Sequence, residues 1–150
     1  MAKYIQGKFT PKNPRKYKGD PTNIKFRSSW ELTMMNRLDT DPNVLEWSSE
    51  ETIIPYRSPL DNKIHRYFPD FKVKVIDRDG KHKTYLMEVK PLKQTQEPKK
   101  TPTNKATKRY IHEVTTYLTN KAKWSAAESY CAKNGYEFLI ITEQVLNIKG

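Results

Sequence analysis

The sequence has very little cysteine, with Cys131 alone among 150 residues. One cysteine excludes an internal disulfide. Cys131 lies in an apolar pattern of helical spacing, which indicates a buried structural thiol rather than a catalytic nucleophile.

Long hydrophobic runs are also absent. No apolar stretch approaches the ~20 residues that are needed to span a bilayer. The first residues, MAKYIQGKFTPKNPRKYKG, lack the apolar segment of a secretory signal. We therefore expect a soluble, cytoplasmic chain with no membrane partner.

Acidic residues are few relative to basic ones. The chain has 28 Lys plus Arg against 17 Asp plus Glu, a net charge of +11. Such a charge favours a polyanionic partner, because each neutralised phosphate releases a condensed counterion. Ribosomal-type, membrane-surface and nuclease proteins share this composition. The 9 Tyr, 5 Phe and 3 Trp are too many for a disordered chain, so we expect one α/β domain with a modest core.

The N-terminal segment, residues 1–27, holds eight Lys or Arg and one acid, Asp20. We expect an extended basic arm before a single domain of residues 28–150. Either the arm is a solvated tail or it contacts nucleic acid. Its candidate DNA contacts are Lys12, Arg15, Lys16 and Lys18.

The remaining elements follow from hydrophobic periodicity and from breakers. Ser28 and Glu31 form an S-x-x-E capping box, which predicts a helix over about 28–39. Strands are predicted at 44–47, 52–56, 71–77, 83–90 and 136–142, and helices at 109–118 and 121–135, the latter ended by Gly135. Residues 91–108 are predicted to form a long exposed loop.

The stretch YLMEVKP, residues 85–91, carries Glu88 and Lys90 on one face of an otherwise apolar strand. A hairpin turning through Arg78, Asp79 and Gly80 pairs residues whose numbers sum to 158, which places Asp70 across from Glu88. Opposed carboxylates, with Cβ atoms roughly 5 Å apart, are destabilising unless a cation compensates them. Oxygen ligands on adjacent strands suit Mg²⁺, and Lys90 would lie beside it to orient or deprotonate a water and to stabilise charge on phosphorus. The alternative is a surface hairpin with a cross-strand ion pair between lysine and carboxylate.

Pro69-Asp70 and Glu88-Val89-Lys90, eighteen residues apart from Asp70 to Glu88, resemble the PD-(D/E)XK nuclease motif. The order helix-strand-strand-strand-helix-strand resembles the restriction-endonuclease-like fold, a mixed sheet flanked by helices. The resemblance implies Mg²⁺-dependent hydrolysis of a DNA phosphodiester, with Mn²⁺ as a substitute metal.

Further segments are similar to the N-terminal nuclease domain of the A subunit of heteromeric transposases. They include SSWELTMMNRLD, DPNVLEWSSE, YFPDF and LMEVKP. In such enzymes an acid on the first helix completes the metal site, and Glu31 is the matching position. Glu31 also fits the capping box, and both roles stay open. Glu50 and Glu51 are weaker substitutes, and Lys121 or Lys123 is where this fold often keeps a supporting basic residue.

Over its full length the chain most resembles the head completion nucleases of T-even-type bacteriophages. That family implies a DNase that processes packaged double-stranded DNA so that heads can join tails. It also implies action in the infected host cell, association with the virion, and head or neck proteins as partners. The alternatives are a transposase-type end-cleaving subunit and a non-enzymatic head-tail connector that binds DNA. Candidate DNA contacts in the second basic segment are Lys93, Lys99, Lys100, Lys105 and Lys108.

Overall fold

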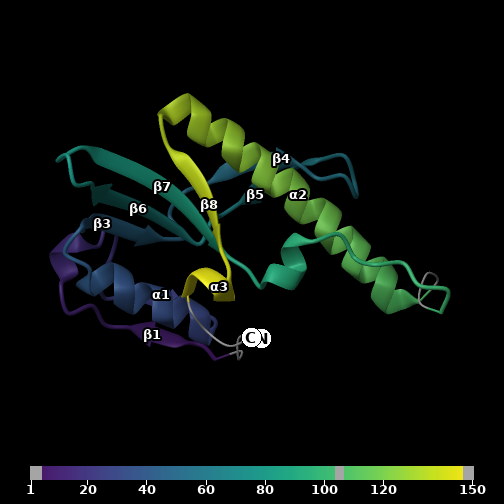
Figure 1. Cartoon of the computed structure of the whole chain (residues 1–150), viewed down its shortest axis with the longest axis horizontal. Helices are drawn as coiled ribbons and strands as arrows, with labels where there is room; N and C mark the ends of the chain where they lie inside the picture. The colour runs from purple at the N-terminus through teal and green to yellow at the C-terminus, as the bar shows by residue number, and fades with distance from the viewer. Residues whose placement is uncertain (1–4, 104–106, 147–150) are drawn as a thin grey trace.

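The computed structural model describes residues 5–103 and 107–146. A four-stranded mixed sheet lies at the centre, in the order β3-β6-β7-β8 (Figure 1). Its strands are β3 (Val44–Ser49), β6 (Phe71–Ile76), β7 (His82–Val89) and β8 (Glu137–Ile141). β3, β6 and β7 pair antiparallel, and β8 pairs parallel to β7. A mixed sheet of this kind confirms the predicted architecture.

The β6–β7 hairpin has the predicted register. Phe71 pairs with Met87 and Ile76 with His82, so paired numbers sum to 158. Gly80 adopts a φ of 78°, the left-handed conformation that a three-residue hairpin loop needs. The Asp77 carboxylate accepts hydrogen bonds from the backbone N–H groups of Asp79 and Lys81, which closes the loop.

Helix α1 (Ser29–Thr40) covers one face of the sheet. The Ser28 hydroxyl accepts a hydrogen bond from the Glu31 N–H at 3.1 Å, as the capping box predicts. Trp30, Met35 and Leu38 point into a core that includes the inward side chains of β3 and β6. Helix α3 (Glu143–Leu146) packs beside α1 and adds Leu146 to the same core.

Helix α2 (Lys108–Asn134) covers the opposite face, and it differs from the prediction. The two predicted helices, 109–118 and 121–135, are one continuous helix, because no Gly or Pro interrupts the segment. The predicted end is right: Gly135 has a φ of 71° and ends the helix. Trp124, Ala127 and Cys131 pack against Leu86, so the predicted buried thiol is confirmed.

A second hairpin lies beneath α2. Its strands are β4 (Ile54–Arg57), which was predicted, and β5 (Ile64–Tyr67), which was not. The sequence did not predict β5 because it lacks alternation: Ile64, His65 and Arg66 are all exposed and only Tyr67 is buried. This hairpin is inserted between β3 and β6, so the sheet retains the predicted order of helix, three strands, helix and strand.

Residues 5–27 differ most from expectation. They form β1 (Gly7–Phe9), the 3₁₀ turn η1 (Pro14–Lys16) and β2 (Ile24–Phe26), and they pack against the core instead of extending from it. The Phe9 and Tyr17 rings meet Trp47 edge to face, with centroids 5.8 and 4.7 Å away. Burying these apolar side chains compensates the conformational entropy lost on ordering the segment.

In the described residues of the predicted loop, 91–103 and 107, one short element forms, the 3₁₀ turn η2 (Leu92–Thr95). Within the described residues, no helix is long and apolar enough to cross a membrane.

Candidate active site

Two carboxylates lie side by side at the end of β6 and β7. Leu86 packs on the α2 side of the sheet and Met87 on the α1 side, so Glu88 lies on the α2 side. The hairpin register continues to Asp70, one residue before β6, and places it opposite Glu88. The Asp70 carboxylate accepts a hydrogen bond from the Val89 N–H at 2.8 Å, which ties it to β7.

The pKa values of both acids are raised. Burial is the larger cause for Asp70, followed by the charge of Glu88. Burial also raises the pKa of Glu88, while Lys90 and a hydrogen bond from Tyr67 oppose the rise. Two carboxylates that share a partly dehydrated site resist simultaneous ionisation. A nearby positive charge would therefore stabilise the pair in its doubly ionised form.

Lys90 supplies part of that charge. Its Nζ lies 3.6 Å from Oε2 of Glu88, and its backbone N–H donates to the Ile141 carbonyl at 2.9 Å. The ion pair is not the surface pair of the alternative interpretation, because Glu88 is only 7% exposed. The Lys90 side chain is 27% exposed, so it reaches from Glu88 toward solvent, where a substrate phosphate can approach.

The sequence did not identify Tyr67 as a site residue. Its hydroxyl donates a hydrogen bond to Oε1 of Glu88 at 2.8 Å, and burial raises its own pKa. Tyr67 therefore stays protonated and holds the Glu88 carboxylate in one orientation. Tyr67 lies in β5, whose sequence does not alternate between polar and apolar residues, so the strand and its buried tyrosine were not predicted.

Lys123 lies on the same side of the site. Its Nζ is 5.7 Å from the Tyr67 ring centroid, and its charge opposes the raised pKa of Glu88. Lys121 lies elsewhere, with Nζ 6.0 Å from the Tyr117 ring. Of the two lysines at the predicted position, only Lys123 faces the acids, and it lies in the middle of α2 rather than at a helix start.

Glu31 is half-buried at the start of α1. Its carboxylate accepts hydrogen bonds from the Ser28 hydroxyl at 3.3 Å and from the Arg27 N–H at 3.4 Å. Burial and Glu50 raise its pKa, and its own charge contributes to the raised pKa of Asp70. Glu31 therefore caps the helix and also lies within electrostatic reach of Asp70.

Glu50 joins the same edge of the sheet. It adopts a left-handed φ of 54°, and its N–H donates to the Asp70 carbonyl at 3.1 Å. Its carboxylate forms an ion pair with Arg27. Glu50 thus positions the Asp70 backbone, while its carboxylate is paired with Arg27.

The donor set suits a hard cation more than zinc. Among the described residues no three His, Cys, Asp or Glu side chains cluster as a metal centre. His65 pairs with Asp61 at 2.7 Å between Nε2 and Oδ2, away from the two carboxylates. Mg²⁺ is commonly held by one or two carboxylates together with waters and phosphate oxygens, and Asp70 with Glu88 matches that requirement.

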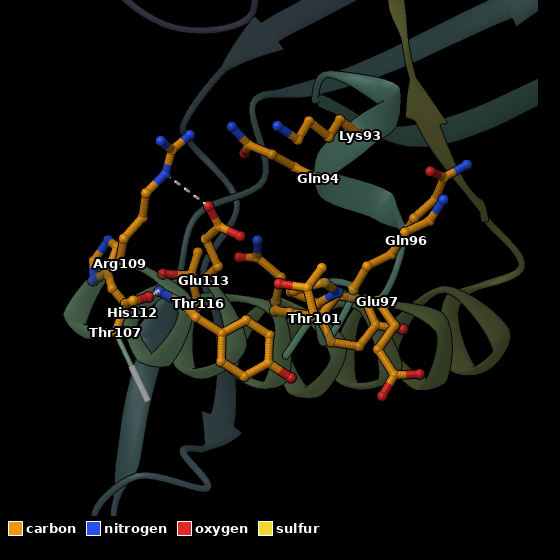
Figure 2. A pocket seen from close by; sticks show the side chains of 15 residues that line it. Lys93, Gln94, Gln96, Glu97, Thr101, Thr107, Arg109, His112, Glu113 and Thr116 are labelled. Carbon is orange, nitrogen blue, oxygen red and sulfur yellow. Dashed lines mark hydrogen bonds and ion pairs between the residues drawn. The ribbon is translucent and has the colours of Figure 1, made fainter. Parts of the chain in front are cut away.

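The predicted DNA contacts fall into two groups. In the N-terminal segment Lys12, Arg15 and Lys18 are exposed, but the Lys16 ammonium donates to the carbonyls of Asp39 and Asp41 at the end of α1. In the second group Lys93 and Lys99 line a cavity beside α2 (Figure 2). Lys100 and Lys108 are exposed, and Lys105 lies outside the described residues.

Comparison with known proteins identifies the family of this chain. Residues 41–143 match a family model described as the N terminal of TnsA-like endonucleases, a span that includes Asp70, Glu88 and Lys90. A curated relative, the head completion nuclease of Enterobacteria phage T4, is 40% identical over 146 residues, which are 96% of this chain and 95% of the relative. No solved structure matches the chain significantly.

Proposed function

The chain belongs to the TnsA-like endonuclease family, with its restriction-endonuclease-like fold, and we propose that it cleaves DNA with the help of a divalent metal ion. The observation that carries the metal proposal is the pair of Asp70, which is half-buried, and Glu88, which is buried, with Lys90 beside them. Lys90 is the nearest positive charge to the two carboxylates, and a bound metal ion would neutralise the negative charge that Lys90 does not.

Asp70 and Glu88 would hold Mg²⁺ or Mn²⁺, with Glu31 as a further acid nearby. When bound, the ion would supply Lewis-acid stabilisation of the phosphoryl oxygens. Tyr67 keeps the Glu88 carboxylate oriented through its 2.8 Å hydrogen bond. Lys90 orients the attacking water and stabilises negative charge that develops on the phosphate.

The biological setting follows from the T4 relative. We propose that this chain acts on packaged double-stranded DNA at head completion, in the infected host cell, with head or neck proteins as its protein partners. Association with the virion is part of the same proposal. The net charge of +11 supports a DNA substrate.

A plasmid-nicking assay tests the metal-dependent cleavage. We expect nicking with Mg²⁺ and none with EDTA, and we expect Glu88→Gln to fold normally but lose cleavage, because the amide keeps the shape without the charge. Glu137→Gln, at the exposed start of β8, is the matched control and should cleave normally. If Glu88→Gln nicks the plasmid at the wild-type rate, Glu88 is not a catalytic residue.

A further inference from the structure

A cavity of about 750 Å³ lies between the N-terminal half of α2 and the segment that follows β7. In Figure 2, Lys93 and Gln94 rise from η2 on one wall, and Arg109, Glu113 and Thr116 come from α2 on the other. The volume is within the usual range of small-ligand sites. The cavity is outside the cluster of Asp70, Glu88 and Lys90.

The most informative residue of this cavity is Asn120. Its side chain lines the cavity and is only 6% exposed. Among the described residues no hydrogen bond joins the Asn120 amide to another group, and its polar atoms are not sealed from the cavity. An amide in this position keeps both its donor and its acceptor available to water or to a ligand. The Asn120 amide can therefore hydrogen-bond a polar group that enters the cavity.

The chemistry of the walls indicates which group. Amides carry a donor and an acceptor in one plane, the pattern that matches a nucleobase edge, and Gln94 adds a second amide to that of Asn120. The rings of Tyr110 and Tyr117 offer apolar surface to a base, and Lys93 offers positive charge to a phosphate. A nucleotide combines these three requirements in one ligand.

The cavity is next to the catalytic acids. Asn120 is three residues before Lys123 on one face of α2, about 4.5 Å along the helix axis. Lys123 contributes its charge to Glu88. On the opposite wall, Lys93 follows Lys90 by three residues. A nucleotide in the cavity would therefore neighbour a phosphate that lies at Glu88 and Lys90.

We propose that the cavity binds an unpaired nucleotide of the DNA substrate, beside the bond that is cut. The proposal rests on the proposed DNA cleavage and adds a preference for single-stranded ends or displaced bases. A base inside a duplex cannot enter a pocket without leaving the stack, so a substrate that is already unpaired avoids that cost.

Fluorescence anisotropy tests the proposal with the full chain carrying Glu88→Gln, so that DNA is not cut. The probes are two DNA hairpins of equal stem, one blunt and one with a three-nucleotide overhang. We expect the overhang to bind about tenfold more tightly, as stacking one base indicates. Adding Asn120→Leu should abolish this preference and leave blunt binding unchanged. Asn36→Leu, an exposed helical Asn on α1, is the matched control and should keep it.

Thermal unfolding separates binding from folding. Because the Asn120 amide has no partner among the described residues, Asn120→Leu should not lower the unfolding temperature, whereas a structural amide would. Gln94→Ala, at an exposed position, provides a second variant that should weaken the preference. Equal binding of both hairpins, or a preference that survives Asn120→Leu, overturns the nucleotide site while DNA binding stands. No binding of either hairpin overturns the DNA substrate itself.

Discussion

At the scale of single residues, Asp70 and Glu88 occupy positions that oppose stability. Each carboxylate loses hydration and faces the other, and burial raises the pKa of both. Lys90 and Tyr67 compensate only one of the two acids directly, since both contact Glu88. Groups held at such a cost are typical of catalytic sites, where function outweighs stability.

The first residue-scale prediction concerns pH and stability. The folded protein holds the Asp70 proton more tightly than the unfolded chain, whose Asp pKa is about 4, so stability without metal should fall as pH rises from about 4 through the raised pKa. Asp70→Asn removes this titration and should be more stable than wild type at pH 8 by at least about 1 kcal/mol. Thermal unfolding in EDTA at several pH values measures it.

The control is Asp79→Asn in the exposed hairpin turn, which should keep the wild-type pH profile. If Asp70→Asn keeps that profile as well, the Asp70 carboxylate is not destabilised in the folded protein.

The second residue-scale prediction concerns Lys90. Lys90→Ala should lower single-turnover cleavage by roughly a hundredfold or more while DNA and Mg²⁺ still bind, because charge on the phosphate is no longer stabilised. Lys90→Arg should restore little, since the planar guanidinium has a different shape. Lys83→Ala, exposed at the far end of β7, is the control. Near-normal cleavage by Lys90→Ala would show that the lysine only pairs with Glu88.

At the scale of elements, α2 joins two functions in one helix. Its C-terminal half buries Trp124, Ala127 and Cys131 against the sheet. Its N-terminal half leaves that core and forms one wall of the cavity (Figures 1 and 2). Lys123 and Asn120 lie where the halves meet, so the helix connects the acids with the cavity.

The element-scale prediction concerns the basic segment that leads into α2. Replacing Lys99, Lys100 and Lys108 together by Gln should weaken binding to all DNA sequences. The salt dependence should flatten by about 0.9 in log–log slope for each phosphate that the variant no longer neutralises. Binding at several salt concentrations measures the slope. Replacing Arg78, Lys81 and Lys83 together by Gln removes the same three charges at exposed positions at the distant end of the β6–β7 hairpin, and is the control for net charge. An unchanged slope would show that the segment is a solvated loop that does not contact DNA phosphates.

At the scale of the whole molecule, the N-terminal segment completes the core. Phe9 and Tyr17 pack against Trp47, and Ile24 is buried in the same core cluster. The Tyr17 hydroxyl accepts a hydrogen bond from the Ser49 N–H at 3.2 Å. Ser49 ends β3, next to Glu50 and the site edge. The segment thus supports the strand end that positions Asp70.

The whole-molecule prediction follows from that packing. Phe9→Ala should lower the free energy of unfolding by about 3 kcal/mol, because it removes a buried aromatic ring. Urea denaturation measures the change. Ile5→Ala, at an exposed position, should alter stability by less than about 0.5 kcal/mol. Equal, small effects of both substitutions would mean that the segment is a free tail after all.

The sequence alone determined the features that depend on neighbouring residues. The capping box of Ser28 and Glu31, the turn at Gly80 and the helix end at Gly135 each act within a few positions. The hairpin register follows from one turn, so counting residues from Gly80 is enough to pair Asp70 with Glu88. Propensity and alternation carry this information because they are local.

Only the tertiary structure decided which distant side chains meet the acids. Tyr67 reaches Glu88 from a strand without alternation, Lys123 from α2, and the Asn120 cavity forms only when the segment after β7 folds beside that helix. The ordering of residues 5–27 was likewise decided by the burial of Phe9, Tyr17 and Ile24 in the core cluster that contains Trp47. These contacts join segments that are far apart along the chain, and no local pattern encodes them, because their energy comes from burial and charge in the assembled core.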